Sequence, residues 1–303
     1  MRIIGIRRDA AYSPNMSDAD TAIFEAVATR LEVLGHEVTR LSDADFLNAF
    51  PDDNPTFDPA MERCVEEAER IFTMSRNALT CCLLDVVERF DHIPCVNTGR
   101  GVSICANRHQ LSLEMNALNV PQPPTCFGSL HEERLANDPV DACELVTTLR
   151  YPVWIKRCFE HTQVKEDVVL VADVEDAITT LGAFARAGVG EVAFCQHVEG
   201  DLVKFYGVAG TGFFDWDYAD PAHSKFGLEV ANGSPHDYPF RADLLQKACE
   251  RLATAIGVPV YGGDAVVQTD GTFCIIDFND WPSFSRCREQ AADAIAKVIA
   301  NEE

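Results

Sequence analysis

Two oxygen-bearing side chains, Asp277 and Asn279, stand one residue apart in the stretch CIIDFNDWPSFS, residues 274–285. The residues just before them are apolar and rich in β-branched side chains, which is typical of a buried strand. Residues i and i+2 of a strand point to the same face, so this pair would lie side by side where the strand ends. Carboxylate and amide oxygens are ligands that Mg²⁺ prefers. The spacing predicts a metal site, with Phe278 facing the opposite layer and Asp280 acting as a capping or surface acid.

A third acid, Asp264, follows the double glycine of YGGDAVV. A hairpin that turns at Asp270-Gly271 would bring Asp264 close to Asp277 and Asn279. Burying carboxylates together without a cation is costly, because like charges raise each other's pKa. We therefore expect these three residues to hold a divalent ion, Mg²⁺ or alternatively Mn²⁺, which takes its other ligands from phosphates and water.

Two lysines lie on strand-like runs upstream of these acids. Lys156 ends the apolar run YPVWIK, from which it can project toward a phosphate as a point charge. Lys204 lies on the second strand of EVAFCQHVEGDLVKFYGVAG, after a turn that can offer backbone groups to a base and a carboxylate to a ribose. A solvated strand end and an ordinary hairpin with surface acids are the alternatives for these two features.

The composition excludes several classes of partner. The 303 residues carry 25 Lys and Arg against 48 Asp and Glu, and the net charge of −23 repels nucleic acid and anionic membranes. No run reaches the roughly 18 apolar residues of a membrane span, and arginines follow the first apolar run, unlike in a signal peptide. The twelve cysteines form no C-x-x-C pair, which favours reduced thiols. We expect a cytoplasmic globular protein that binds neither nucleic acid nor membrane.

The elements that must position these residues change in character along the chain. Four strand-like runs alternate with helical periodicity in the first hundred residues, at 2–6, 36–41, 70–75 and 93–97. This alternation is typical of a parallel sheet with helices on both faces. A helical stretch at 107–120 is followed by several strands and one helix. The segment after them is mostly typical of antiparallel strands, with turns at Gly262-Gly263 and Asp270-Gly271. A last helix covers residues 285–301.

This sequence resembles the ATP-grasp superfamily in the order of four features along the chain. They are the strand lysine Lys156, the turn, the second lysine Lys204, and the strands that carry Asp264 and Asp277-x-Asn279. The resemblance covers about residues 100–303. It implies an α/β (α+β) fold with a parallel-sheet domain over 1–98, a central lid lobe over 99–195 and a C-terminal lobe carrying the metal site over 196–303. Two branches are most similar: the ligases that add glutamate to ribosomal protein tails, and the inositol phosphate kinases.

The resemblance also implies roles for individual residues. Lys156 would contact the phosphates of ATP, and Lys204 would face the phosphates or the reacting group as a catalytic residue. The hinge that contacts adenine would be formed by Gln196, His197 and Val198. The acid that binds the ribose would be Asp201 or, alternatively, Glu199. One or two Mg²⁺ ions on the three metal ligands would bridge the β- and γ-phosphates.

Two departures from the family pattern matter. Arg108 stands where many relatives carry a lysine at the start of the 107–120 helix, so the charge is kept but with the geometry of a fork. The loop over residues 157–167 contains no glycine, although this loop is often glycine-rich in the family and covers the phosphates. Either its side chains, His161 in particular, replace backbone amides, or the loop has a different shape that suits an unusual substrate.

Basic and hydroxyl side chains near the predicted site are candidates for an anionic substrate. They are Arg7, Arg8, Arg76, Ser283, Ser285, Arg286 and Arg288. The carboxyl ends of parallel strands favour Arg7 and Arg76. Arg286 follows the metal ligands within one turn and is our second catalytic candidate. A solvated surface arginine is the alternative for each.

Three functions are compatible with these residues. The first is a carboxylate–amine or carboxylate–thiol ligase that uses ATP to form an acylphosphate on a small molecule or peptide. The second is a small-molecule kinase of the inositol phosphate type, although 25 thinly spread basic residues suit a polyphosphate substrate poorly. The third is a nucleotide-binding module without catalysis. Related folds are often dimers, so a homodimer is left open.

Overall fold

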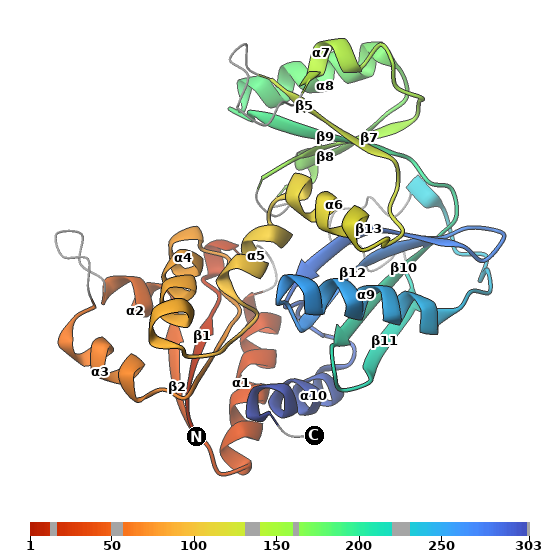
Figure 1. The fold of residues 1–303 in the computed structure, drawn as a ribbon. Coiled ribbons are helices and arrows are strands. Elements are labelled where there is room, and N and C mark those ends of the chain that lie inside the picture. The colour runs from red at the N-terminus through yellow and green to blue at the C-terminus, as the bar shows by residue number, and fades with distance from the viewer. Residues whose placement is uncertain (13–16, 50–56, 131–139, 160–163, 220–230, 302–303) are drawn as a thin grey trace.

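Three β-sheets organise the chain (Figure 1). The computed structural model describes residues 1–303 except 13–16, 50–56, 131–139, 160–163, 220–230 and 302–303. The first sheet has the order β2-β1-β3-β4 and is parallel throughout, as predicted. Its strands are β1 (Arg2–Arg7), β2 (Glu37–Ser42), β3 (Arg70–Thr73) and β4 (Cys95–Val96).

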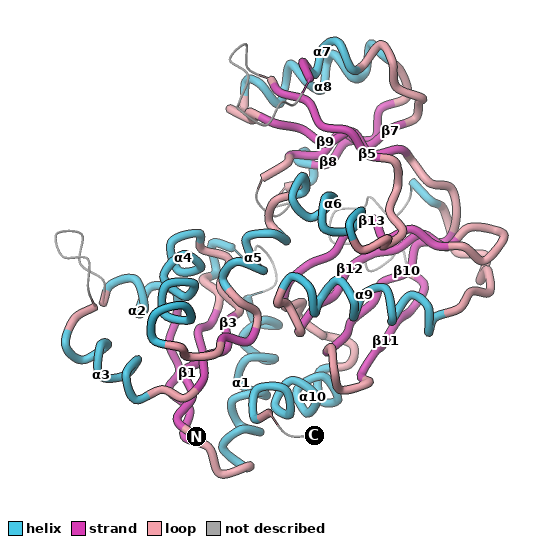
Figure 2. Tube along the Cα trace, in the orientation of Figure 1, coloured by secondary structure: helices cyan, strands magenta, loops and turns pink. Residues whose placement is uncertain are grey.

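Helices cover both faces of this first sheet because alternate residues of β1 point to opposite sides. Ile3 packs with the first long helix and with the C-terminal helix, whereas Ile4 packs with the helices of the other face. The C-terminal helix therefore lies against the first domain (Figure 2). The helical segments of this region are η1 (Ala10–Tyr12), α1 (Ser17–Val33), α2 (Asp43–Asn48), α3 (Pro59–Glu67), α4 (Ala78–Val86), η2 (Val87–Asp91), α5 (Gly99–Cys105) and α10 (Arg288–Ala300).

The second sheet, with the order β6-β5-β9-β7-β8, forms the lobe at the top of Figure 1. Its core lies between the sheet and α8, where Ile155, Leu181 and Phe194 are buried. The elements are β5 (Thr125–Ser129), β6 (Val140–Asp141), α7 (Ala142–Leu145), β7 (Val153–Arg157), η3 (Lys165–Asp167), β8 (Val168–Val171), α8 (Val174–Arg186) and β9 (Glu191–Gln196).

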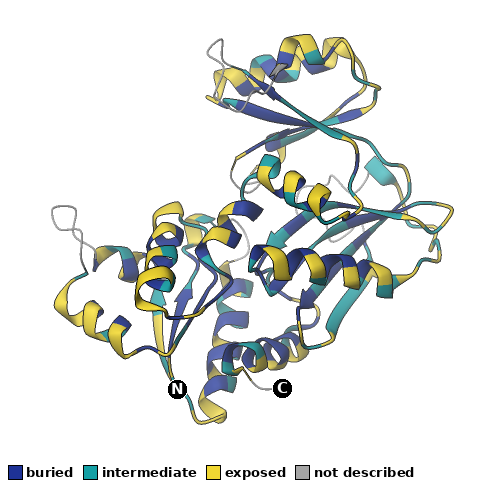
Figure 3. Ribbon diagram, in the orientation of Figure 1, coloured by how far each residue is buried: buried dark blue, intermediate teal, exposed yellow. Residues whose placement is uncertain are grey.

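The third sheet is antiparallel, with the order β11-β10-β12-β13. Its strands are β10 (Asp201–Val208), β11 (Phe213–Tyr218), β12 (Val260–Val267) and β13 (Phe273–Asp280). Two helices, α6 (Arg108–Ala117) and α9 (Ala242–Ile256), cover one face. The helix α9 was not predicted from the sequence; one side of it is buried and the other is exposed (Figure 3).

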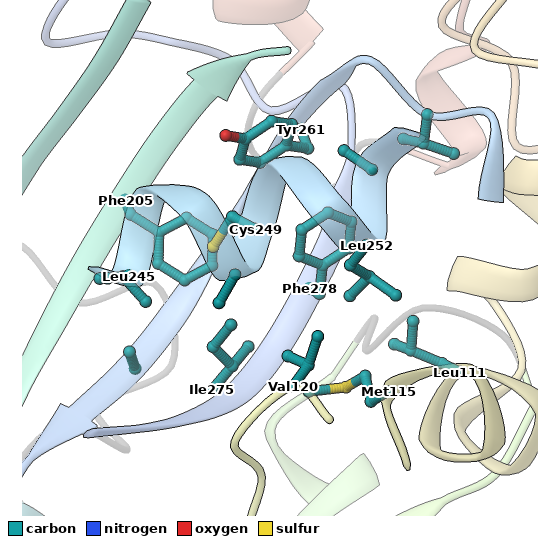
Figure 4. Packing of buried hydrophobic residues seen from close by; sticks show 14 of the residues in the cluster. Leu111, Met115, Val120, Phe205, Leu245, Cys249, Leu252, Tyr261, Ile275 and Phe278 are labelled. Carbon is teal, nitrogen blue, oxygen red and sulfur yellow. The ribbon is translucent and has the colours of Figure 1, made fainter. Parts of the chain in front are cut away.

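The core beneath α9 and α6 explains which face of the third sheet carries the polar residues. Leu252 of α9 and Met115 of α6 pack with Phe205 and Phe278 of the strands (Figure 4). Phe278 therefore faces this apolar layer, as its position between Asp277 and Asn279 predicts. The opposite face of the sheet is left for polar side chains.

The prediction of a turn at Gly262-Gly263 is wrong, because both glycines lie inside β12. A Cβ at Gly263 would come within 2.1 Å of the Asp277 carbonyl oxygen, and one at Gly262 within 2.7 Å of Pro282 Cγ. The glycines therefore allow close contact with β13 and the segment after it. The predicted turn at Asp270-Gly271 is confirmed, since it joins β12 to β13 and Gly271 has a φ of +80°.

Among the described residues, no helix is long and apolar enough to cross a membrane. All twelve cysteines are free thiols, as the absence of paired spacing predicts. Burial raises the pKa of several of these thiols, such as Cys105 and Cys249, which keeps them protonated.

Candidate functional site

Three acidic or amide side chains meet on the polar face of the third sheet. Asp264 on β12 is in register with Lys204 on β10 and with Asp277 on β13. Lys204 Nζ lies 3.7 Å from Asp264 Oδ1, and Asn279 Nδ2 donates to Asp277 Oδ2 at 2.6 Å. The β12–β13 hairpin thus brings together the three predicted metal ligands, and the pairing of β10 with β12 adds Lys204.

A β-bulge in β13 links this cluster to the second sheet. Asp264 pairs with Asp277 but Ala265 pairs with Ile275, so Ile276 is the extra residue. Its carbonyl oxygen accepts a hydrogen bond from Lys156 Nζ at 3.3 Å, and the lysine is only 8% exposed. The lysine at the end of the apolar strand β7 therefore reaches the metal strand of another sheet.

Arg108 places a cation next to Asp277. Its Nη1 lies 3.2 Å from Asp277 Oδ1, while its Nε donates to the Arg157 carbonyl at 3.0 Å. Basic partners therefore offset both carboxylates, Asp264 and Asp277. The burial of like charges alone does not require a metal here, contrary to the reasoning from sequence.

One cavity of about 390 Å³ contains this cluster. At its apolar part lie Met115, Trp154 and Ile275, together with the predicted hinge residues Gln196, His197 and Val198. Such a volume and mixture of apolar and polar walls is typical of a small-molecule site. Trp154 Nε1 donates to His197 Nδ1 at 3.1 Å, and burial lowers the pKa of His197, so this imidazole is neutral.

The cavity is basic although the chain is strongly acidic. Among the described residues, five basic side chains line it, against three acidic ones. The basic ones are Arg8, Arg76, Arg108, Lys156 and Lys204, and the acidic ones are Asp20, Asp264 and Asp277. Buried Asp280 beside Arg8 and Arg76 offsets part of this charge, and in a chain of net charge −23 the remaining excess favours a local anionic ligand.

Several predicted site residues do not line this cavity. They are Arg7, Glu199, Asp201, Ser285, Arg286 and Arg288. Arg7 donates to Thr21 Oγ1 at 3.0 Å, and Arg286 lies 3.3 Å from Asp215 Oδ2 and also pairs with Asp217. His161 lies outside the described residues. For all of these residues, a role in binding the nucleotide or the substrate stays a prediction that the hydrogen bonds and ion pairs of the described residues do not support.

Asp201 has a structural task instead. Its carboxylate is 1% exposed and accepts hydrogen bonds from the backbone N–H groups of His236 and Tyr238 at 2.8 and 2.9 Å. Although burial opposes ionisation, these bonds hold the pKa of Asp201 below its ordinary value.

We therefore expect Asp201→Asn to destabilise the protein by about 1–3 kcal/mol at neutral pH, the contribution of hydrogen bonds to a charged group. Because the folded state lowers this pKa, the contribution is present above the ordinary aspartate value and disappears as the pH falls through the folded one. Urea denaturation of both proteins should show a difference at neutral pH that shrinks below about pH 4. A variant that unfolds normally but loses nucleotide binding would restore Asp201 to the ribose role.

Asp280 was predicted to be a capping or surface acid, and this is wrong. It is 0% exposed, and its carboxylate lies 3.2 Å from Arg8 Nη2 and 3.1 Å from Arg76 Nε. Arg8 also pairs with Asp20 at 3.0 Å. Asp280 thus ties the first domain to the end of the metal strand. No local sequence signal indicates this contact, because Arg8 and Asp280 are 272 residues apart.

The donor set fits Mg²⁺ that arrives with a nucleotide better than a permanently bound ion. Asp264, Asp277 and Asn279 supply oxygen ligands from two carboxylates and an amide. Mg²⁺ is usually held by one or two carboxylates plus substrate phosphates and water. Within the part of the chain that the structure describes, no three His, Cys, Asp or Glu side chains group as a metal cage.

Comparison with solved structures identifies the fold. The chain superposes on a RimK domain ATP-grasp protein from Sphaerobacter thermophilus with a TM-score of 0.63 and 19% identity, over 99% of this chain and 100% of the other. It matches a D-alanine–D-alanine ligase from Bacillus anthracis, complexed with ATP, with a TM-score of 0.67 and 14% identity, over 99% and 98% of the two chains. A D-alanyl-alanine synthetase A from Vibrio cholerae gives 0.66 and 10%, with the same coverage.

Sequence comparison adds no closer relative. No family model matches the chain, and the search of curated proteins found no match. The similarity in structure extends over both partners of each comparison, including the first parallel-sheet domain. This chain has the ATP-grasp fold over nearly its whole length.

Proposed function

We propose that this protein is an ATP- and Mg²⁺-dependent ligase that activates a carboxylate as an acylphosphate and transfers the acyl group to an amine, or alternatively to a thiol. The observation that carries the proposal is the single cavity in which Lys156, Lys204 and Arg108 surround Asp264 and Asp277 next to an apolar end. The names of the structural neighbours support it, since two are called D-alanine–D-alanine ligase or D-alanyl-alanine synthetase.

Different parts of the cavity would bind different parts of Mg-ATP. Adenine would lie at the apolar part, between Met115, Ile275 and the hinge of Gln196, His197 and Val198. Lys156 and Arg108 would hold the phosphates, and Lys204 would neutralise charge beside Asp264. Mg²⁺ on Asp264, Asp277 and Asn279 would offset the negative charge of the transferring phosphate.

The chemistry has two balanced steps. A carboxylate oxygen of the acid attacks the γ-phosphorus, and ADP leaves as the acylphosphate forms. The amine nitrogen then attacks the acyl carbon, and inorganic phosphate leaves with the former carboxylate oxygen while the nitrogen loses a proton. Lys156, Arg108 and Lys204 stabilise the charge that develops on the phosphate oxygens.

The kinase alternative receives less support from the cavity. A polyphosphate substrate needs many cations around the acceptor, but among the described residues the first domain contributes only Arg8 and Arg76 to the cavity, and Arg8 is already held by Asp20, Asp280 and two backbone carbonyls. A catalytically silent module is disfavoured because the lysines and the metal ligands all line one cavity.

Product analysis distinguishes these functions. Purified protein with Mg-ATP should be screened against small acids combined with amines, and separately against polyols. ADP and free phosphate that appear in equal amounts, only with an acid and an amine together, support the ligase. ADP without free phosphate in the presence of a polyol would establish the kinase. A protein whose melting temperature does not respond to Mg-ATP would contradict nucleotide binding altogether.

Lys156→Met should weaken ATP binding roughly 10- to 100-fold, as expected for removing a charge-assisted hydrogen bond to a phosphate. Methionine keeps the length of the side chain but loses the cation. Calorimetric titration of Mg-ATP analogue measures the change. Lys247→Met, on the exposed side of α9, is the matched control and should bind like wild type. Equal affinities of the two variants would remove Lys156 from the phosphate site.

A further inference from the structure

The part of the cavity formed by the first domain has a different chemistry from the nucleotide part. It is lined by Arg8, Tyr12, Asp20 and Arg76 of the first domain, with Ser283 from the segment after β13. The proposed roles of ATP and Mg²⁺ use none of these side chains.

Arg8 is held within the protein through all three nitrogens of its guanidinium group. Its Nε donates to the Met74 carbonyl, its Nη1 to Asp20, and its Nη2 to Asp280 and the Trp281 carbonyl. The residue is 6% exposed, and burial together with nearby Arg76 lowers its pKa. Arg8 therefore serves to fix Asp280 rather than to meet a ligand.

Arg76 is held differently. Its Nε donates to the Asp280 carboxylate at 3.1 Å and its Nη2 to the Asp280 carbonyl at 3.0 Å. Within the described part of the chain, Nη1 has no hydrogen-bond partner. A guanidinium carries five N–H donors in a rigid fork, so most of the donors of Arg76 are available in the cavity.

Two hydroxyl groups line the same part of the cavity. Tyr12 Oη accepts a hydrogen bond from Asn77 Nδ2 at 3.2 Å, which leaves its own proton available to donate. Ser283 Oγ lies 3.0 Å from Ser285 Oγ and can also donate into the cavity. One cation and two hydroxyl donors suit a single planar anion such as a carboxylate.

We propose that Arg76, Tyr12 and Ser283 form a subsite for a second, non-reacting carboxylate of the substrate acid. This inference rests on the proposed ligase function and makes the substrate a small dicarboxylic acid. Arg76 binds the carbonyl of Asp280, the residue after Asn279, and a strand advances about 3.3 Å per residue. The subsite thus lies within the length of a small molecule from the metal ligands.

Matched pairs of acids test the subsite. Wild-type protein loaded with Mg²⁺ and a non-hydrolysable ATP analogue is titrated with malonate, succinate and glutarate, and with propionate, butyrate and valerate of equal chain length. We expect at least one diacid to bind more tightly than its monoacid counterpart. Arg76→Met should weaken binding of that diacid roughly 10- to 100-fold and leave the monoacid unchanged.

The control is Arg30→Met, which removes another arginine that joins the first domain to acids of the C-terminal helix, Glu289 and Asp293, but lies outside the cavity. This variant should keep the preference for the diacid. Tyr12→Phe leaves no buried charge behind, so it tests the subsite even if Arg76→Met unfolds. It should weaken diacid binding roughly 2- to 10-fold.

Either of two results would overturn the subsite: no diacid binds better than its monoacid, or the preference survives both Arg76→Met and Tyr12→Phe. The ligase proposal would stand in those cases if acid- and amine-dependent phosphate release is observed. If Mg-ATP analogue itself fails to bind, the proposed function is wrong, and this failure is recognised before any acid is added.

Discussion

Replacing Asp277 with alanine should abolish the Mg²⁺-dependent part of nucleotide binding and lower turnover roughly 100- to 1,000-fold. Asp277 is a predicted metal ligand that pairs with Arg108 and accepts a hydrogen bond from Asn279. Its loss removes one of two carboxylates and also releases the amide of Asn279. A metal that depends on so few protein ligands cannot be held by the remainder.

The measurement is the rise in melting temperature caused by ATP analogue with and without Mg²⁺. Wild type should show a large increment from Mg²⁺, and Asp277→Ala should show none. Asp270→Asn is the control, because Asp270 lies at the exposed turn of the same hairpin and outside the cavity. An unchanged Mg²⁺ increment in Asp277→Ala would exclude the pair as a metal site.

Replacing Asp280 with alanine should destabilise the protein by about 3–5 kcal/mol, the effect of removing one partner from a buried ion pair. In the wild-type protein Asp280 is 0% exposed, so the variant leaves Arg8 and Arg76 without their shared carboxylate in a buried position. Asp280→Asn keeps an oxygen acceptor and should lose less. Both changes are measured as the free energy of unfolding in urea.

The comparison for this prediction is Asp293→Ala. Asp293 also joins the first domain to the C-terminal part through Arg30, but its side chain is 63% exposed. Such an exposed pair contributes about 0–1 kcal/mol. If Asp280→Ala and Asp293→Ala have the same small effect, the buried cluster does not stabilise the association of the two parts.

The local sequence pattern was sufficient to predict the structural features that depend on periodicity or on a turn. The alternating first hundred residues form the parallel sheet, and the Asp270-Gly271 turn produces the β12–β13 hairpin. The i, i+2 spacing places Asp277 and Asn279 on one face, and the hairpin then brings Asp264 beside them. These features depend on residues close in sequence.

The errors concern contacts between distant segments. Gly262 and Gly263 look like a turn, but the close approach of Pro282 and the Asp277 carbonyl decides their place in a strand. Asp280 looks like a surface acid because its partners, Arg8 and Arg76, are 272 and 204 residues away in the sequence. The bulge at Ile276, which lets its carbonyl meet Lys156, also has no signal in the local pattern.

The central claim is that a carboxylate is activated by phosphorylation, and transfer of oxygen tests it most directly. An acid that supports turnover is labelled with ¹⁸O in its carboxylate, and the released phosphate is analysed by mass spectrometry. An acylphosphate route predicts that each phosphate formed carries one oxygen from the carboxylate. Phosphate without label, formed at the same rate as product, would contradict the ligase mechanism.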